Sequence, residues 1–539
     1  MTRHDKDVCC RLSFSLVVAG ILVSVVFVST TATEAQAPSD RMGGPGVVPG
    51  IRYVAPGGDC EGATPCDGSI QHAVDAADAG DEIRVAAGTY TGSGEEVVHL
   101  AKSLVIRGGY ATSDWDISDP EANPTTLDGQ NARGVVRVSG GVTPTLYGLR
   151  VTGGQGNAGG GIRVDAAGAV IDTVEVLSNS GKTGAGIACD GGNVTVVGGR
   201  VAGNTADGGA FGFAYGGGVY LRDCDAALRS VIIEDNTATG NGGGGGGVYA
   251  DRSDLVLTGA RLEANEAGLF CSGGGLYARR SAVFLSSNTV VSNTSENVGG
   301  GVYLRDNASS LLNDNLFAGN SCFDDGGGLY LTGEHAALSR NVVQDNQASQ
   351  DGAGMYVADS EASLVNSLVV DNESIYAGSG NGIHVADASV RSWHGTLARN
   401  SGGEGSGIHV SSGSIALTNT ILVSHTVGVY AESGATATLS ATLWGTATWG
   451  NEQDASGPGS ILTGTTGHNL WALPGFAAPG AGDFHLSSGS AAIDAGTTSH
   501  VVTDLDGEPR FDVPDLGVDE HWSPGALKHL YLPWITRNG

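Results

Sequence analysis

A glycine-rich turn recurs through residues 159–428 at nearly constant intervals. Successive turns end 25, 32, 29, 28, 26, 27, 26, 28, 25 and 21 residues apart, at Gly161, Gly186, Gly218, Gly247, Gly275, Gly301, Gly328, Gly354, Gly382, Gly407 and Gly428. Repetition with this period is typical of a solenoid, in which each repeat packs only against its neighbours. We therefore expect one elongated domain, rather than the roughly three or four domains that 539 residues would otherwise suggest.

An asparagine follows most of these glycines at a fixed distance. Counting 18 residues on gives Asn179, Asn204, Asn236, Asn265, Asn293, Asn346, Asn372 and Asn400, while Gly301 reaches Asn320 at 19 and Gly407 reaches His425. Asparagine suits a bend because its side chain bonds nearby backbone and tolerates left-handed dihedrals. Stacked amides can also bond one another from repeat to repeat. The series therefore predicts a structural column of asparagines at one corner.

The pattern between these markers indicates the fold class. Positions one, ten and fifteen after each glycine are nearly always aliphatic, as in Leu276, Leu285 and Val290. Strands this short, with no helical periodicity between them, cannot be βαβ units, whose crossovers need a dozen or more residues. Glycine supplies 89 of 539 residues, and methionine only 3. We predict an all-β parallel β-helix with coils about 4.8 Å apart.

The N-terminus is typical of a secretory signal peptide. Basic residues precede an apolar run of seventeen residues that begins at Leu12, and small residues follow, with cleavage expected after Ala35 or Ala37. An uncleaved anchor helix is the alternative, because the run is just long enough to span a bilayer. The mature protein is expected to be secreted, extracellular or at the cell surface. It has a net charge of −30 and shows no basic stripe for nucleic acid.

The rest of the chain divides by composition. We predict a signal peptide (1–37), a linker (38–52), an N-terminal cap with the first coils (53–130), the β-helix repeats (131–445), a loop-rich C-terminal cap or anchor-like segment (446–521) and a tail (522–539). Ser69 is a plausible N-cap for a helix over Ile70 to Asp78, which would cover the open end of the β-helix. The tail either packs back on the last coil or makes a surface contact.

The repeat resembles known proteins. Residues Gly299-Gly300-Gly301-Val302-Tyr303 and Phe317-Ala318-Gly319-Asn320 are similar to the two repeat motifs of chlamydial polymorphic outer membrane proteins. Four C-terminal segments, Asp483 to Leu486, Ala492 to Gly496, Asp504 to Gly507 and Asp515 to Gly517, resemble the choice-of-anchor Q segment of bacterial surface proteins. The resemblance covers most of residues 53–521. It implies a secreted bacterial protein with the pectin-lyase-like fold, a single-stranded right-handed parallel β-helix, and no single chemistry, since the family includes lyases, hydrolases and adhesins.

Six cysteines remain after the predicted cleavage. Cys60 and Cys66 share a tight Gly/Pro loop, and we predict a disulfide between them. Cys271 and Cys322 lie in similar turns two coils, or about 9 to 10 Å, apart, so that their pairing would require bent turns and is left open. Cys189 lies three residues after its glycine and is expected to point inward and be inert.

An aromatic ring recurs two residues after most of the glycines. Because the first and third positions face inward, this second position should face outward. The rings either form a surface that binds a sugar chain or only stack on one another and stiffen the strand. The long turn from Thr205 to Gly217 adds further aromatics, which are functional or simply folded over the edge. The candidate ligand-binding residues are Tyr220, Tyr249, Tyr277, Tyr303, Tyr330, Tyr356, His384, His409, Phe211 and Phe213.

Catalysis has weaker support. A pectate-lyase-like enzyme needs acidic calcium ligands and an Arg or Lys to abstract a proton. The candidates are Arg222, Arg279 and Arg305 as bases and Asp223, Asp251 and Asp325 as ligands, although charged residues at coil edges are usually just solvated. Asp504 and Asp506 are candidate calcium ligands, with a hydrogen-bonded cap turn as the alternative. No cofactor or metal is expected, and calcium is the one alternative that these residues suggest.

Taken together, these features predict a secreted or cell-surface scaffold for adhesion or polysaccharide binding. Its expected partner is a polysaccharide or surface glycan, and it is expected to be a monomer without a membrane span. The alternative is a polysaccharide lyase or glycoside hydrolase of the same fold. An enzyme needs acidic and basic groups that converge in one groove, whereas a binding protein needs only the aromatic face.

Overall fold

The computed structural model describes residues 49–376, 378–464, 469–511 and 513–522, together with the backbone of β1 (Phe14–Val18) and β2 (Ile21–Val25). These two strands pair antiparallel within the predicted signal segment. The expected cleavage positions, most of the linker and the tail beyond residue 522 lie outside the described residues. The repeats belong to the unit that begins at Pro49.

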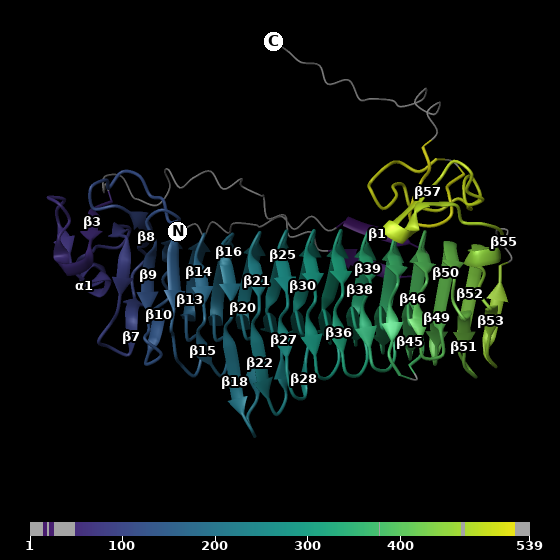
Figure 1. Cartoon of the computed structure of the whole chain (residues 1–539), viewed down its shortest axis with the longest axis horizontal. Coiled ribbons are helices and arrows are strands. Elements are labelled where there is room, and N and C mark those ends of the chain that lie inside the picture. Colours follow the sequence, from purple (N-terminus) through teal and green to yellow (C-terminus); the bar gives the residue numbers. More distant parts are fainter. Residues whose placement is uncertain are drawn as a thin grey trace, which may run out of the picture. The chain divides into compact units, whose positions relative to one another are not determined.

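Each central coil presents three faces, and equivalent strands of successive coils pair in parallel along each face (Figure 1). The first face comprises β7 (Glu96–Leu100), β10 (Gly134–Ser139), β13 (Ile162–Asp172), β16 (Ile187–Val197), β20 (Val219–Arg229), β24 (Val248–Asp251), β29 (Leu276–Arg279), β33 (Val302–Arg305), β37 (Leu329–Thr332), β41 (Met355–Ala358), β45 (Ile383–Ala386), β49 (Ser406–Val410), β51 (Val427–Ala431) and β53 (Gln453–Ser456). The second comprises β3 (Ile51–Val54), β5 (Glu82–Ala86), β8 (Val105–Tyr110), β11 (Thr145–Tyr147), the C-terminal halves of the long strands β13, β16 and β20, and then β25 (Asp254–Thr258), β30 (Ala282–Ser286), β34 (Ser309–Asn313), β38 (His335–Ser339), β42 (Glu361–Val365), β46 (Ala388–Trp393), β50 (Gly413–Val423), β52 (Thr436–Trp444) and β54 (Ser460–Thr463). The all-β parallel β-helix predicted from the repeat is thus confirmed.

The third face and the turn corner complete each coil. The third face comprises β6 (Gly88–Tyr90), β9 (Thr125–Asp128), β12 (Leu149–Thr152), β14 (Glu175–Leu177), β17 (Arg200–Ala202), β21 (Ile232–Glu234), β26 (Arg261–Glu263), β31 (Thr289–Val291), β35 (Leu316–Ala318), β39 (Val342–Gln344), β43 (Leu368–Val370), β47 (Thr396–Ala398) and β55 (Leu470–Trp471). The turn corner has the short strands β15 (Ser180–Gly181), β18 (Thr205–Gly209), β22 (Thr237–Gly240), β27 (Glu266–Ala267), β32 (Thr294–Ser295), β36 (Ser321–Cys322), β40 (Gln347–Ala348), β44 (Glu373–Ser374) and β48 (Ser401–Gly402), with β19 (Ala214–Tyr215), β23 (Gly243–Gly244) and β28 (Cys271–Ser272) beside them. Figure 1 shows this corner along one edge of the stacked coils.

The inward positions of the strands form one continuous aliphatic core. Leu276, Leu285 and Val290, which the repeat places inside, are at most 1% exposed. The core extends from Val54 to Trp444. Each fully buried aliphatic side chain of this kind contributes about 1.5–3 kcal/mol to folding.

The asparagine column forms the corner after the third face, as predicted. Asn236 is fully buried, and its Nδ2 donates both to Oδ1 of Asn265 at 2.9 Å and to the carbonyl of Val201, one coil back, at 2.8 Å. Oδ1 of Asn265 also accepts from the backbone N–H of Asn236 at 3.1 Å. The same geometry runs from Asn179 to Asn400. Each interior amide therefore has its donors and its acceptor satisfied without water.

The column explains the motif glycine that precedes it by 18 residues. An ideal Cβ on Gly247 would lie 2.6 Å from the carbonyl oxygen of Gly275 and 3.1 Å from Cγ of Asn265. A side chain here would push the backbone of the next coil and the ladder amide apart. Glycine and asparagine are thus two parts of one packing arrangement.

His425 replaces asparagine in the column. Asn400 Nδ2 donates to Nε2 of His425 at 3.1 Å, and the backbone N–H of His425 donates to Oδ1 of Asn451 at 3.0 Å. Nδ1 lies 3.3 Å from the same oxygen, which suits a neutral ring with its proton on Nδ1. Burial lowers the pKa of His425 to about 4.

The N-terminal end of the coils is covered by α1 (Ile70–Ala76), and the predicted cap is confirmed (Figure 1). Ser69 Oγ accepts from the backbone N–H of His72 at 3.4 Å. Ile70, Ala73 and Val74 are buried against the core. The helix ends two residues before the predicted Asp78 because Ala77 is already extended.

The C-terminal segment packs on the outer side of the third face, where β56 (Phe476–Ala478) and β57 (Asp483–Leu486) pair antiparallel. A second apolar cluster joins its side chains to outward residues of the coils: Phe476, Phe484, Leu486, Leu516 and Val518 with Leu368, Val370, Ala398, Ile421 and Val423. Arg510 forms a buried ion pair with Glu520 at 3.1 Å and donates to Oδ1 of Asn366 at 2.9 Å. The segment is therefore fixed to the flank of the coils.

The part of the chain that the structure describes from residue 49 onward contains two disulfides. Cys60 and Cys66 are bonded, as predicted, with Cα atoms 5.9 Å apart. Cys189 points inward as expected, but the prediction that it is inert is wrong, because it is bonded to Cys224 with Cα atoms 6.0 Å apart. Both side chains face the interior where the first face of successive coils bends toward the second, which counting along a single face does not reveal. Cys271 and Cys322 are buried and free.

The His425 position leads to a prediction about acid stability. Since its pKa in the folded protein, about 4, lies below the unfolded value of about 6.5, only the unfolded chain takes up a proton between these pH values. Stability should therefore fall as the pH decreases from about 6.5 toward 4. We expect His425→Asn, which continues the amide column, to reduce this fall in thermal melts. The same change at exposed His335 should leave the fall as in wild type, and equal acid sensitivity of His425→Asn would contradict the assignment.

Candidate functional site

The predicted aromatic column is present on the first face. Ring centroids of successive members lie 4.6 to 5.6 Å apart from Tyr220 to Tyr430. The rings lie outside the aliphatic core, as alternation along the strand requires. Their stacking is continuous across coils that are far apart in the sequence.

The column is nevertheless not an open surface, and the expectation that it faces solvent is wrong. Tyr249 is 2% exposed, Tyr277 6% and both His384 and His409 3%. The glycine-rich turn packs against the base of these side chains, since an ideal Cβ on Gly273 would lie 2.7 Å from Cβ of Tyr277, and Tyr215 from the long turn lies against Tyr249 with ring centroids 4.7 Å apart. The rings therefore form a second small core, together with Ala188, Tyr215 and Val298. Stacking on one another, the alternative to sugar binding, describes most of this column.

Exposed aromatic and large aliphatic residues lie instead in four of the turns between a ladder asparagine and the next motif glycine. We call this set the turn ridge; its members are 51% to 93% exposed and comprise Phe211, Phe213, Leu269, Phe270, Phe323, Ile375 and Tyr376. Within the described part of residues 159–428, Ile232 is the one exposed large apolar residue that lies elsewhere. The sequence predicted Phe211 and Phe213 as candidates but missed the others. Aromatic residues in the turns of variable length were the sequence signal that could have identified the other members.

A groove opens between two members of the ridge. Its volume is about 360 Å³, and it is lined by Phe323, Tyr376, Ser349, Gln350, Asp351 and Gly378. Gln350 donates to Asp324 Oδ1 at 2.9 Å, and Asp351 Oδ1 accepts from the backbone N–H of Ser379 at 2.7 Å. The groove thus combines aromatic side chains with polar groups that are held in place by hydrogen bonds.

The candidate catalytic arginines are paired at the corner between the first and second faces. Asp251 is buried and binds Arg252, Arg279 and Arg280 at 3.0, 3.1 and 2.8 Å. Arg222 pairs with Asp190, which raises the pKa of Arg222 and so opposes a role as base. These ion pairs make the residues parts of a structural network.

Two of the three remaining catalytic candidates are also held in ion pairs. Asp223 pairs with Arg252 at 2.7 Å, and Arg305 with Asp306 at 3.2 Å. Asp325 lies apart from them, in the turn before β37, where burial raises its pKa to about 6 and its Oδ1 accepts from the N–H of Asp351. The six candidates therefore lie at opposite ends of the first-face strands and do not share one groove.

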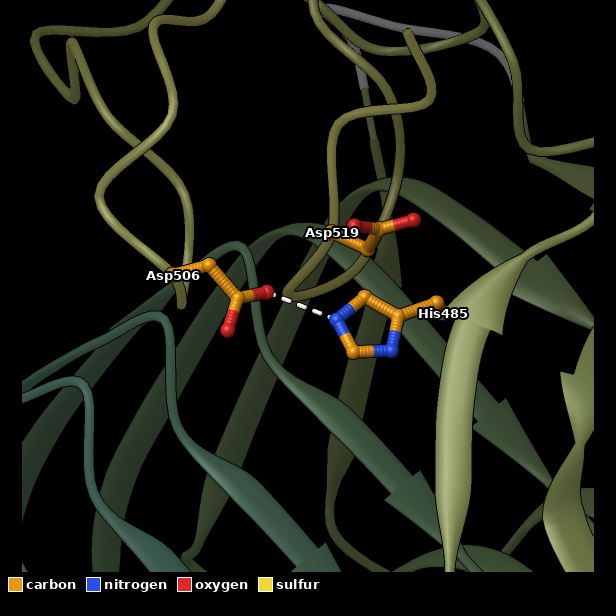
Figure 2. A group of neighbouring side chains, drawn as sticks. All are labelled: His485, Asp506 and Asp519. Atoms are coloured by element: carbon orange, nitrogen blue, oxygen red, sulfur yellow. Dashed lines mark hydrogen bonds and ion pairs between the residues drawn. The ribbon is translucent and has the colours of Figure 1, made fainter.

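The candidate calcium ligands have different environments. Asp504 is buried, and its Oδ1 accepts from the N–H groups of Asp506 and Glu508 at 3.0 and 2.8 Å, which is the cap turn considered as the alternative. Asp506 instead lies 2.7 Å from Nε2 of His485 (Figure 2). With Asp519 these two form a group whose ligand atoms all lie within 4.8 Å of one another.

The charge state of His485 bears on metal binding at this group. Partial burial lowers the pKa of His485, but its contacts with Asp506 and Asp483 outweigh burial and raise it to about 9. At neutral pH the ring is therefore an imidazolium held between carboxylates. One nitrogen and two carboxylates suit a divalent ion such as zinc, which would first have to displace this proton.

A family model agrees with the fold. The model of the family described as the right handed beta helix region matches residues 131–294 and 217–393, in agreement with the predicted hand. The crystal structure of pectate lyase Pel9A is similar at 12% identity over 88% of this chain and 97% of that chain, with a TM-score of 0.23. A search of curated proteins returns no match. The resemblances to polymorphic outer membrane proteins and to the choice-of-anchor Q segment stay predictions.

The helices of the described residues are short, and α1 has seven residues. None of the helices in this part of the chain is long and apolar enough to cross a membrane.

The His485 ion pairs predict a loss of C-terminal packing at alkaline pH. Because the folded pKa of about 9 exceeds the unfolded value of about 6.5, the stabilisation is complete below about pH 6.5 and disappears as the pH rises through about 9. We expect thermal melts followed by tryptophan fluorescence, to which Trp449 beside Phe476 contributes, to show a lower melting temperature for this segment at pH 10 than at pH 7. In His485→Gln the difference between the melting temperatures at pH 7 and pH 10 should be smaller. An unchanged pH dependence in this variant would exclude His485 as its origin.

Proposed function

We propose that the protein is a secreted or cell-surface β-helix scaffold that binds polysaccharide through the turn ridge. The observation that supports this most directly is the groove in which exposed Phe323 and Tyr376 lie on either side of a polar strip. Aromatic faces pack against the apolar faces of sugar rings, while amide, hydroxyl and carboxylate groups bond the sugar hydroxyls. The buried column is not needed for this function and supplies rigidity.

The charge around the groove favours a neutral glycan. Asp324, Asp325 and Asp351 lie at or next to it, and the whole chain has a net charge of −30. Arg279 and Arg305 do not offset this charge, because they lie at the other end of the first-face strands, where they bind Asp251 and Asp306. A polyuronate would therefore be repelled.

Export is the cellular setting that suits the rest of the molecule. Two disulfides support an oxidising compartment, where such bonds persist. The predicted signal peptide supports the same setting.

A glycan array tests the proposal. Wild type should bind one or more neutral polysaccharides, and the double variant Phe323→Ala/Tyr376→Ala should bind them about tenfold or more weakly, since it loses both aromatic contacts of the groove. Ile232→Ala removes an apolar residue outside the ridge that is 38% exposed, and it serves as the control. It should bind like wild type.

Two results would overturn the proposal. One is the absence of binding by wild type to any glycan, and the other is equal binding by wild type and the double variant at matched thermal stability. Release of sugar products during the assay would instead support the alternative of a lyase or hydrolase.

A further inference from the structure

The members of the turn ridge occur in every second coil. Exposed aromatic or large aliphatic side chains occupy four turns: 205–217, 266–274, 321–327 and 373–381. The turns between and after them, 237–246, 294–300, 347–353 and 401–406, carry glycine or polar residues at the surface. The alternation therefore covers eight consecutive turns.

The turns of successive coils stack on one another in register. The alternation therefore gives a regular distance between apolar turns along the axis of the coils. The backbone N–H of Phe323 donates to the carbonyl of Ser295 at 3.0 Å, and that of Ile375 to the carbonyl of Ala348 at 2.9 Å. Gly242, in a turn without aromatics, leaves room for the Phe213 ring, which would lie 3.0 Å from a Cβ there. With coils about 4.8 Å apart, the apolar positions recur at about 9.6 Å.

From this spacing we infer that the ridge binds an extended, neutral β-1,4-linked polysaccharide that lies along the axis of the coils, with one apolar contact for every two sugars. A pyranose unit in such a chain advances by about one coil, and in a flat ribbon alternate units present the same face to a surface. Each aromatic turn then meets the same face of every second sugar. The inference rests on the proposed function and adds the linkage and direction of the ligand.

The intervening turns suit the remaining sugars. Between Phe323 and Tyr376 the surface is formed by Ser349, Gln350 and Asp351, whose polar groups can bond hydroxyls. Glu296 and Glu404 occupy comparable turns elsewhere, so that a uronate chain would meet carboxylates at these positions. An α-1,4-linked glucan curves and would leave the ridge after a few units.

Chain-length dependence tests the inference with the full-length protein. In calorimetry, cello- or manno-oligosaccharides should gain affinity mainly on reaching three, five and seven units, as each added pair reaches the next apolar turn about 9.6 Å away. We expect a gain of about fivefold or more at these steps and little at even lengths. Maltoheptaose and an oligogalacturonate of equal length should bind at least tenfold more weakly than the best heptasaccharide.

Variants in one turn give a second readout. Leu269→Ala/Phe270→Ala should remove the contribution of its turn and so abolish one step of the length dependence, whereas Asn297→Ala in the next turn should retain all the steps. Affinity that is independent of length, or preferred binding of maltoheptaose or oligogalacturonate, would overturn this inference while leaving the proposed function intact. If none of these probes and no polysaccharide on the array binds, both fail.

Discussion

The hydrogen bonds between stacked asparagine amides are the interaction on which the rest of the structure depends. From Asn179 to Asn400 the side chains lie in a buried corner. Each interior Nδ2 donates to the asparagine Oδ1 of the next coil and to a backbone carbonyl of the previous coil, and each Oδ1 accepts from the asparagine of the previous coil. A buried amide without partners would cost about 1–3 kcal/mol for each unsatisfied group, so that a shift of register by one residue is strongly disfavoured. The motif glycines allow this close approach, since a side chain at Gly247 would collide with the next coil.

The fixed corner has a consequence for function. Because the ladder sets the start of every turn and the motif glycine sets its end, changes of length and sequence concentrate between them. The turns contribute little to the aliphatic core, and their side chains can be exposed, as Phe211, Phe323 and Tyr376 are. The stacked rings beneath them add a second rigid layer. A regular scaffold thus presents a surface whose spacing is that of the coils themselves.

Much of this scaffold could be predicted from the sequence, whereas less of its surface could be. The period and the asparagine at a distance of 18 predicted the coils and the ladder, because both depend on local counting. Alternation correctly placed Tyr249 outside the core but could not show that it is covered, since part of the cover comes from Tyr215, whose ring lies 4.7 Å from that of Tyr249 and which belongs to the long turn before the preceding motif glycine. The Cys189–Cys224 bond joins different coils across a bend. Phe270 and Tyr376 follow their ladder asparagines at different distances, so no column revealed them.

The central claim is that the asparagine ladder holds the coils in register, and hydrogen exchange of Asn265→Ala tests it most directly. The variant leaves one of the two Nδ2 hydrogens and the backbone N–H of Asn236 without an acceptor, at a cost of about 1–3 kcal/mol for each group, while the bond from Nδ2 to the Val201 carbonyl remains. We predict faster exchange at the ladder amides of residues 236 and 265 and in the adjoining turns, together with a lower thermal midpoint, and no such change for exposed Glu266→Ala. Exchange and thermal midpoint equal to those of wild type in Asn265→Ala would contradict the account.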